Sequence, residues 1–247
     1  MKGDEKLNYK NAEKFDQELD KLKINLTDMQ KEQFQKYYEI LVEWNKVMNL
    51  TAITEYDEVN LKHFADSLTI LRLIDMKAIS TVIDVGTGAG FPGIPLKIVF
   101  PQIELVLLDS LNKRIKFLNE VTEKLGLKNV QAIHGRAEDL ARKQEYREKF
   151  DLCVSRAVAN LSTLSEYCIP FVKKNGVFVS YKSGESEKEI QQSEKAVHIL
   201  GGTIEEIDKF CLPGTDMGRA LVKIRKVKNT SGKYPRKAGM PGKEPLK

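Results

Sequence analysis

The stretch Val82-Ile-Asp-Val-Gly-Thr-Gly-Ala-Gly-Phe-Pro-Gly93 joins an apolar run to a glycine-rich turn. Its first residues read as a buried strand, and the residues after the turn read as the start of a helix. Glycines at positions 86, 88 and 90 allow positive φ angles and let a ligand approach the backbone closely. This arrangement predicts a nucleotide or nucleoside site at the end of the first strand of an α/β sheet.

Two classes of ligand fit this turn. Gly88, Gly90 and Gly93 match the dinucleotide fingerprint G-x-G-x-x-G, which keeps an NAD-dependent oxidoreductase open. Asp84, two residues before Gly86, favours the other class, because a carboxylate there opposes a pyrophosphate and attracts a cationic ligand. S-adenosylmethionine (AdoMet) carries both an ammonium and a sulfonium group. The D-x-G-x-G-x-G spacing is similar to that of AdoMet-dependent methyltransferases.

Polar residues also follow the next three apolar runs. Asp109 ends the second run, where a carboxylate can accept both hydrogen bonds of a ribose diol, although it can also cap a helix that starts at Leu111. Ala137 and Glu138 follow the third run and are candidates for adenine contacts, although Glu138 also suits the first turn of a helix. Arg156 follows the fourth run, at a strand end that faces the site in a doubly wound sheet.

Short β-branched runs alternate with amphipathic segments from residue 80 onward, which is typical of a parallel α/β sheet. Strands are expected at residues 81–85, 104–108, 130–134, 152–155, 176–181, 203–211 and 219–225. The last two are joined by too few residues for a crossover helix, so they should pair antiparallel. The predicted fold is a doubly wound, mostly parallel, Rossmann-like α/β sheet that ends in an antiparallel strand pair.

The first 78 residues read as helices without strands. Thr27 with Gln30 fits a capping box, and apolar residues then recur at helical spacing. Asp57 is expected to cap a further helix. We therefore divide the chain into an N-terminal helical cap (1–78), an AdoMet-dependent methyltransferase core (79–226) and a basic C-terminal tail (227–247).

Charge and composition narrow the choice of partners. The 247 residues have a net charge of +5, and the tail accounts for all of it with six basic residues against one acidic residue. Such a tail can contact the phosphates of a polyanion, or it can be a solvated end. Three widely spaced cysteines and three histidines form no metal-ligand pattern, so no metal is expected. No run approaches a membrane span, which predicts a cytoplasmic protein, and no apolar seam argues against a monomer.

Several motifs together resemble the glucose-inhibited division protein B family, the bacterial 16S rRNA guanine-N7 methyltransferases. The resemblance covers essentially the whole chain and is most specific in the glycine turn and the tail. The motifs are Trp44-Asn-Lys46 with Asn49-Leu-Thr51, His63 with Asp66-Ser-Leu68, Gly90-Phe-Pro-Gly-Ile-Pro95, Gly135-Arg-Ala-Glu138, Ser155-Arg-Ala-Val-Ala159 and Tyr234-Pro-Arg-Lys-Ala-Gly-Met-Pro-Gly-Lys-Glu-Pro-Leu246.

The resemblance implies transfer of a methyl group from AdoMet to N7 of one guanosine in the decoding-region loop of 16S rRNA, so the partner is that rRNA or the small ribosomal subunit. It also implies that Gly86, Phe91, Ala137, Glu138 and Arg156 line the AdoMet site. For Phe91 a core role at the start of the helix stays open.

Guanine N7 has a lone pair and no proton, so the reaction needs no general base, and no essential acid or base is expected. Stacking and donors to O6 should hold the base. The candidates for positioning the substrate are Arg156, Arg136, His63, Asn45 and Lys46, although His63 also suits a packing role.

Phosphate contacts are expected from Arg219, Arg236 and Lys237. Removal of residues 228–247 is expected to weaken RNA binding and to spare AdoMet binding. Three alternatives stay open: the NAD-dependent oxidoreductase, an RNA-binding or assembly protein with a vestigial cofactor fold, and a methyltransferase acting on another RNA or a small molecule.

Overall fold

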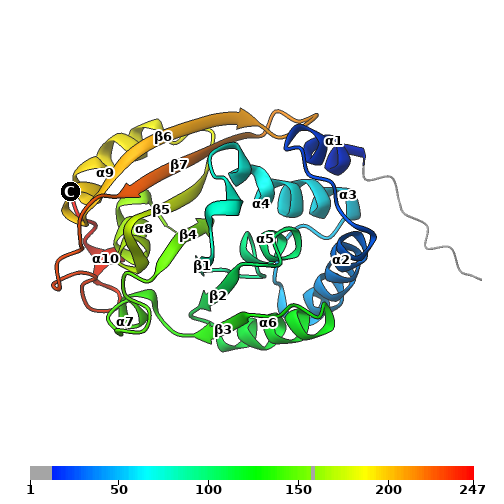
Figure 1. Ribbon diagram of the computed structural model, residues 1–247, viewed down its shortest axis with the longest axis horizontal. Helices are drawn as coiled ribbons and strands as arrows, with labels where there is room; N and C mark the ends of the chain where they lie inside the picture. Colours follow the sequence, from blue (N-terminus) through cyan, green and yellow to red (C-terminus); the bar gives the residue numbers. More distant parts are fainter. Residues whose placement is uncertain (1–12, 157–158) are drawn as a thin grey trace, which may run out of the picture.

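The computed structural model describes residues 13–156 and 159–247. In this part of the chain, seven strands form one sheet in the order β3-β2-β1-β4-β5-β7-β6, with helices on both faces (Figure 1). The strands are β1 (Thr81–Val85), β2 (Glu104–Asp109), β3 (Val130–His134), β4 (Phe150–Arg156), β5 (Val172–Ser183), β6 (Gly202–Cys211) and β7 (Gly218–Lys226).

The pairing of the strands confirms the predicted fold class. Strands β1 to β5 run parallel to one another. Strand β7 pairs antiparallel with both β5 and β6. The chain passes from β1 to β2 on one side and later to β4 on the other, so the strand order reverses beside β1. In such sheets ligands bind at this reversal, outside the carboxyl ends of the strands.

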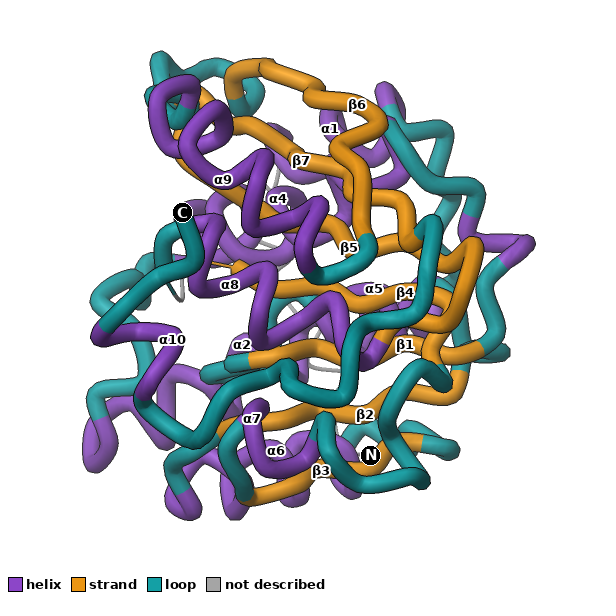
Figure 2. The backbone as a smooth tube through the Cα atoms, turned by 90° about the vertical axis from the view of Figure 1, so that its left-hand side faces the viewer, coloured by secondary structure: helices purple, strands orange, loops and turns teal. Residues whose placement is uncertain are grey.

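Alternating strand residues build a separate apolar core on each face of the sheet, as expected where both faces are covered. Val82 and Val154 belong to one core, and Ile83 and Cys153 belong to the other. Figure 2 shows the sheet between its helical layers. The first core lies under α1 (Glu13–Lys21), α2 (Asp28–Met48), α4 (Asp66–Leu68), α5 (Gly93–Val99) and α6 (Asn112–Lys124). The second lies under α7 (Ala137–Leu140), α8 (Leu161–Cys168) and α9 (Glu187–Ile199).

Helix α2 begins with the predicted capping box between Thr27 and Gln30. Two side chains of α2 also donate hydrogen bonds to the C-terminal ends of other helices. Gln30 Nε2 donates to Ile98 O at 2.8 Å, and Gln33 Nε2 donates to Leu125 O at 2.8 Å. Carbonyls at helix C-termini lack partners within their own helix, so these bonds fix α2 over α5 and α6.

The run that follows α2 differs from the sequence prediction at one residue. Asp57 does not cap a helix, because α3 (Tyr56–Val59) already begins one residue earlier, after Glu55. The chain then continues without a break through a π-helical segment (Asn60–Ala65), α4 and a 3-10 turn (Thr69–Arg72). A further 3-10 turn (Met76–Ala78) precedes β1, and another (Ile169–Phe171) precedes β5.

The tail folds back against α7 and α8 and includes the short helix α10 (Met240–Lys243) (Figure 1). The Arg147 guanidinium donates to Thr230 O at 2.8 Å and to Tyr234 O at 2.9 Å. The tail is therefore a packed segment rather than a solvated end. The proposed division of the chain at residues 78 and 226 stays a prediction, although the strands do run from Thr81 to Lys226.

Candidate functional site

The glycine turn leaves β1 with three glycines at positive φ, and two of them serve different purposes. At Gly88 (φ 62°) a Cβ atom would meet no heavy atom within 4 Å, so the missing side chain leaves open space. At Gly90 (φ 92°) it would lie 2.5 Å from Ile94 Cδ1 and 2.6 Å from Tyr37 Oη. Gly88 therefore makes room for a ligand, and Gly90 makes room for Ile94 of α5 and Tyr37 of the helical cap.

Asp84 lies beneath this turn and is fully buried. Its Oδ2 accepts hydrogen bonds from Thr87 Oγ1 at 2.7 Å and Gly93 N at 2.9 Å, whereas Oδ1 has no partner among the described residues. Burial raises the pKa of Asp84 to about 6, against the opposing effects of these hydrogen bonds and the charge of Arg156. Asp84 lines neither of the two pockets described below, but its buried negative charge favours a cationic ligand above the turn. It opposes a pyrophosphate, because Asp84 already occupies the Gly93 N–H at the start of α5.

Two adjoining pockets open at the carboxyl ends of the strands and share Gly86, Asp109 and Ser110. The larger one, about 380 Å³, is lined by these three with Leu50, Thr51, His63, Thr87, Gly88, Ala89, Phe91, Arg114 and Arg156. The smaller one, about 180 Å³, is lined by the shared three with Val85, Leu108, Gly135, Arg136, Ala137, Glu138 and Tyr167.

Asp109 lies between the two pockets with both carboxylate oxygens engaged. Oδ2 accepts from Gly88 N at 2.9 Å and from Arg114 Nη1 at 3.0 Å. Oδ1 accepts from Leu111 N at 2.9 Å. Asp109 does not cap a helix that starts at Leu111, because α6 begins at Asn112 with Leu111 as its N-cap and no side-chain cap; its carboxylate instead bonds the Leu111 backbone just before the helix and also reaches the glycine turn.

In the smaller pocket, Ala137 and Glu138 are buried at the start of α7, while Arg136 is exposed at its edge. Glu138 Oε1 accepts a hydrogen bond from Gly239 N of the tail at 2.8 Å. The wall of this pocket is therefore built from two distant parts of the chain.

In the larger pocket, the rings of His63 and Phe91 stack with centroids 4.6 Å apart and an interplanar angle of 17°. The Arg156 guanidinium carbon lies 5.0 Å from the centre of the Phe91 ring. Tyr37 stacks on the ring of Phe91 as well, and its hydroxyl donates to Ala89 O. Phe91 is buried, so it both packs in the core and contributes to the pocket wall.

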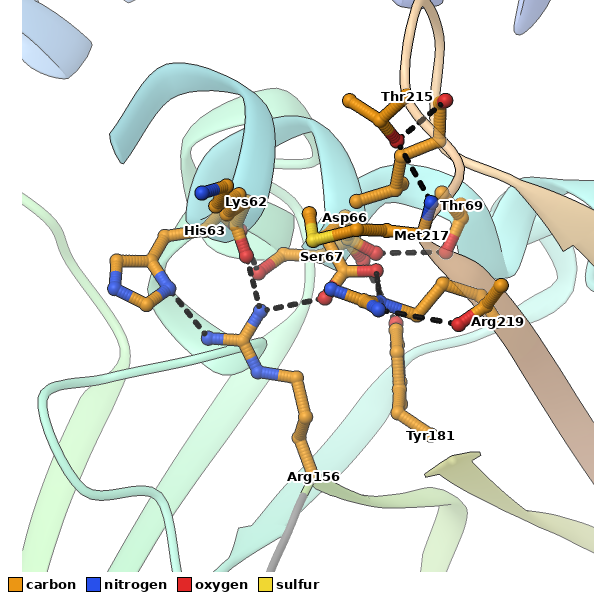
Figure 3. A network of polar contacts seen from close by, with 12 residues as sticks. Lys62, His63, Asp66, Ser67, Thr69, Arg156, Tyr181, Thr215, Met217 and Arg219 are labelled. Carbon is orange, nitrogen blue, oxygen red and sulfur yellow. Dashed lines mark hydrogen bonds and ion pairs between the residues drawn. The ribbon is translucent and has the colours of Figure 1, made fainter. Parts of the chain in front are cut away.

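Asp66 connects three parts of the fold (Figure 3). This buried residue of the helical cap accepts Arg156 Nη1 from β4 at 3.0 Å on Oδ2 and Arg219 Nε from β7 at 3.0 Å on Oδ1. Next to it, Tyr181 Oη donates to Ser67 O at 2.7 Å. A buried carboxylate shared by two guanidinium groups fixes the cap to the carboxyl end of the sheet.

His63 is held in a neutral form. Burial lowers its pKa to about 3, helped by the charges of Arg156, Lys62 and Arg219, and the Lys62 backbone carbonyl opposes this only in part. Its ring nitrogens contact Arg156 Nη2 at 3.3 Å and Thr51 Oγ1 at 2.8 Å. His63 is therefore a weak base at neutral pH.

The remaining candidates occupy different places. Asn45 lies behind the larger pocket, where its Oδ1 accepts Thr51 N at 2.9 Å, and Lys46 is exposed and lines neither pocket. Arg236 forms a bidentate pair with Glu166, whose side chain is 1% exposed, whereas Lys237 is exposed. Arg219 and Arg236 thus have internal partners, and Lys237 is directed to solvent. Ala157 and Val158 of the fourth-strand motif lie outside the described residues.

Sequence reasoning did not single out Thr51, Asp66 or Arg114 as site residues. Thr51 and Asp66 belong to two of the family motifs, Asn49-Leu-Thr51 and Asp66-Ser-Leu68, and this membership was the only sign of a role in the site. Their contacts arise only in the folded chain. No helix of the described ranges is long and apolar enough to cross a membrane. The same ranges hold no group of three or more His, Cys, Asp and Glu residues that could bind a metal ion.

The fold, the glycine turn and the two acidic strand ends define a Rossmann-like methyltransferase. A protein described as a methyltransferase, in complex with the Haloferax volcanii Trm112 methyltransferase activator, shares this fold with a TM-score of 0.57 and 14% identity, over 76% of this chain and 97% of its own. The profile of the family described as rRNA small subunit methyltransferase G matches residues 30–215, and the chain belongs to this family.

Several relatives carry the name ribosomal RNA small subunit methyltransferase G, and two of them show the extent of the likeness. That of Lachnoclostridium phytofermentans is 55% identical over 94% of this chain and 96% of its own length. That of Bacillus subtilis is 48% identical over 96% of this chain and 99% of its own length. The likeness therefore covers nearly the full length of both proteins, and with it the predicted family and enzyme class are confirmed.

Proposed function

We propose that this enzyme transfers the methyl group of AdoMet to N7 of a guanosine in the decoding-region loop of 16S rRNA. The observation that carries the proposal is the larger pocket, in which the glycine turn meets the stacked His63 and Phe91 rings. A cofactor on the turn and a planar base beside the rings would then share one space. Such an activity belongs in the bacterial cytoplasm, where rRNA is made.

The residues around the turn fit AdoMet. Asp84 supplies buried negative charge, and Asp109 stands at the border of the two pockets, where it can face a ribose. The cofactor set we propose is Asp84, Gly86, Gly88, Gly90, Phe91, Asp109, Ala137, Glu138 and Arg156. AdoMet, when bound, supplies an electrophilic methyl group on a positively charged sulfur.

The protein's own part is to bind and orient. N7 carries a free lone pair and no proton, so no side chain has to remove one. The low pKa of His63 agrees with this, because an imidazole with a pKa of about 3 stays neutral at neutral pH and is a weak base. The His63–Phe91 pair would stack on the base, Arg156 would position His63, and Asn45 would shape the loop behind them. Arg136 and Lys46, which are exposed, would contact the surrounding RNA.

The test is incorporation of label from methyl-tritiated AdoMet into small ribosomal subunits, and separately into naked 16S rRNA, from cells that lack this gene. Nucleoside analysis should recover the label as 7-methylguanosine, and the Asp84→Asn variant, which should bind AdoMet less tightly, should incorporate less label at low AdoMet concentration. Label in another nucleoside would refute the N7 assignment. Absence of label despite AdoMet binding would redirect the search to another RNA or a small molecule.

A further inference from the structure

Thr51 occupies a fixed position on the wall of the larger pocket. Helix α2 is followed by Asn49 in the left-handed conformation (φ 46°), which turns the chain sharply. Asn45 Oδ1 then accepts Thr51 N at 2.9 Å. These contacts hold the Thr51 backbone, so its side chain is placed independently of any ligand.

The tautomer of His63 follows from its neighbours. A guanidinium group has only donors, so Arg156 Nη2, 3.3 Å from Nδ1, requires a lone pair on that nitrogen. We therefore assign the single proton of neutral His63 to Nε2. This nitrogen lies 2.8 Å from Thr51 Oγ1, so His63 donates and Thr51 accepts.

The Thr51 hydroxyl also accepts a second hydrogen bond, from Ile53 N at 3.0 Å. A hydroxyl has two acceptor positions and one proton. Both acceptor positions are filled by N–H groups, so the proton must be donated elsewhere. Among residues 13–156 and 159–247 this hydroxyl donates no hydrogen bond to an acceptor, and Thr51 borders the pocket. The fold thus presents an oriented O–H donor to whatever the pocket binds.

We infer that the Thr51 hydroxyl donates a hydrogen bond to O6 of the target guanine and so selects guanine over adenine. The inference rests on the proposed function and deepens it. O6 and N7 lie on the same edge of guanine, so a donor that holds O6 also sets the position of N7. Adenine carries an amino donor in place of O6, and two donors would then face each other.

Arg156 is less suited to this role. Its Nη1 donates to Asp66 Oδ2 at 3.0 Å and to Lys62 O at 3.3 Å, which uses both Nη1 N–H groups, and one N–H of Nη2 faces His63 Nδ1. It acts instead as a positioning residue, because it fixes the His63 tautomer that leaves the Thr51 proton free.

The experiment compares Thr51→Val, which removes the hydroxyl at nearly constant volume, with Thr51→Ser, which keeps it. Small ribosomal subunits from cells that lack the gene are the substrate, kcat/KM for 7-methylguanosine formation is the readout, and AdoMet affinity is measured by calorimetry. We expect Thr51→Val to lower kcat/KM by about 10- to 100-fold and Thr51→Ser by less than about 3-fold, with AdoMet affinity unchanged in both. Thermal unfolding of each variant shows whether the loop is intact.

Three results would overturn the inference. They are an unchanged kcat/KM in Thr51→Val, an equal loss in the folded Thr51→Ser protein, and a loss of AdoMet affinity that accounts for the whole effect. The third result would indicate that the Thr51 hydroxyl donates to the carboxylate of AdoMet rather than to the guanine. Failure of the proposed function is seen separately, because the wild-type enzyme would then form no 7-methylguanosine.

Discussion

Gly239 in the tail donates its backbone N–H to Oε1 of Glu138 at 2.8 Å, across 101 positions of sequence. Glu138 is 3% exposed and lines the smaller pocket. Two residues further along the tail, Pro241 O accepts a hydrogen bond from Thr163 Oγ1 at 3.0 Å, so the end of the tail is anchored twice. The tail therefore supports the candidate adenine side of the site as well as carrying charge.

This contact revises the expectation that tail removal spares AdoMet binding. Deletion of residues 238–247 should weaken AdoMet affinity about 3- to 10-fold, because Glu138 loses a hydrogen-bond donor and its side chain becomes free to move. Calorimetric titration of AdoMet measures the effect, and Lys237→Ala, which leaves Gly239 in place, is the control. An affinity equal to that of the full chain would show that the tail does not shape the pocket.

Asp84→Asn should lose AdoMet affinity by about 1–3 kcal/mol and yet stabilise the free protein at pH 8. Burial raises the folded-state pKa of Asp84 from 3.8 to about 6. Protonation therefore favours the folded state: the contribution of Asp84 to stability is full below pH 3.8 and is lost as the pH rises through about 6. Asp84→Asn has no carboxylate to ionise. At pH 8 its free energy of unfolding should therefore exceed that of the wild type by on the order of 1 kcal/mol, after allowance for the cost of the new buried amide.

Urea unfolding of the wild type and Asp84→Asn at pH 4 and pH 8 tests the argument. The difference in unfolding free energy between Asp84→Asn and the wild type should be present at pH 8 and nearly absent at pH 4. AdoMet affinity of the wild type should also fall below pH 6, as the carboxylate gains a proton. A variant that is less stable at pH 8 would contradict the assignment of the burial cost.

Gly88→Ala and Gly90→Ala should fail in different ways. Both glycines have positive φ, so each alanine costs about 1 kcal/mol in backbone strain. At Gly90 the new Cβ also collides with Ile94 and Tyr37, which adds about 1–3 kcal/mol of overpacking. At Gly88 it enters open space, so the fold is kept and AdoMet affinity falls by about tenfold or more. Unfolding curves and AdoMet titrations on the pair separate the two effects, and equal stability losses would disprove the distinction.

Asp66→Asn should destabilise the fold by about 3–5 kcal/mol, because it leaves two guanidinium groups without their shared carboxylate. Arg219→Met is the matched control, since Asp66 keeps Arg156 and the cost should be nearer 1 kcal/mol. Denaturant midpoints rank the three proteins. If Asp66→Asn unfolds at the wild-type midpoint, the cap is not held by this bridge.

The sequence predicted the sheet well because each strand has a local signature. The β-branched runs placed all seven strands within a few residues, and the short link between the last two predicted their antiparallel pairing. The prediction of the helix near Asp57 was less accurate. Tertiary packing extends this helix through a π-helical segment, which no capping pattern indicates.

Contacts between distant residues account for what the sequence could not predict. Asp66 meets Arg156 and Arg219 across 90 and 153 positions, and no local pattern reports such a bridge. The use of Glu138 by Gly239 was hidden for the same reason. The donor role inferred for Thr51 depends on the His63 tautomer, which is set by an arginine from another strand. Local motifs predicted where the site lies, whereas tertiary contacts determine which of its hydrogen-bonding groups remain available to a ligand.

Arg236 and Lys237 are neighbours in the chain, and their substitutions should have opposite consequences. Arg236→Ala leaves the buried Glu166 carboxylate without its bidentate partner, so the fold should lose about 3 kcal/mol or more. Lys237→Ala removes an exposed charge and should leave the free energy of unfolding within about 0.5 kcal/mol of the wild type.

The same substitution tests a phosphate contact. If Lys237 contacts a phosphate, Lys237→Ala should reduce the slope of log affinity for the small subunit against log salt concentration by about 1. Filter binding from 50 to 300 mM salt, about the range where such slopes are resolved, provides the comparison. A wild-type slope in Lys237→Ala would remove this residue from the RNA contact set, and a stable Arg236→Ala protein would return Arg236 to it.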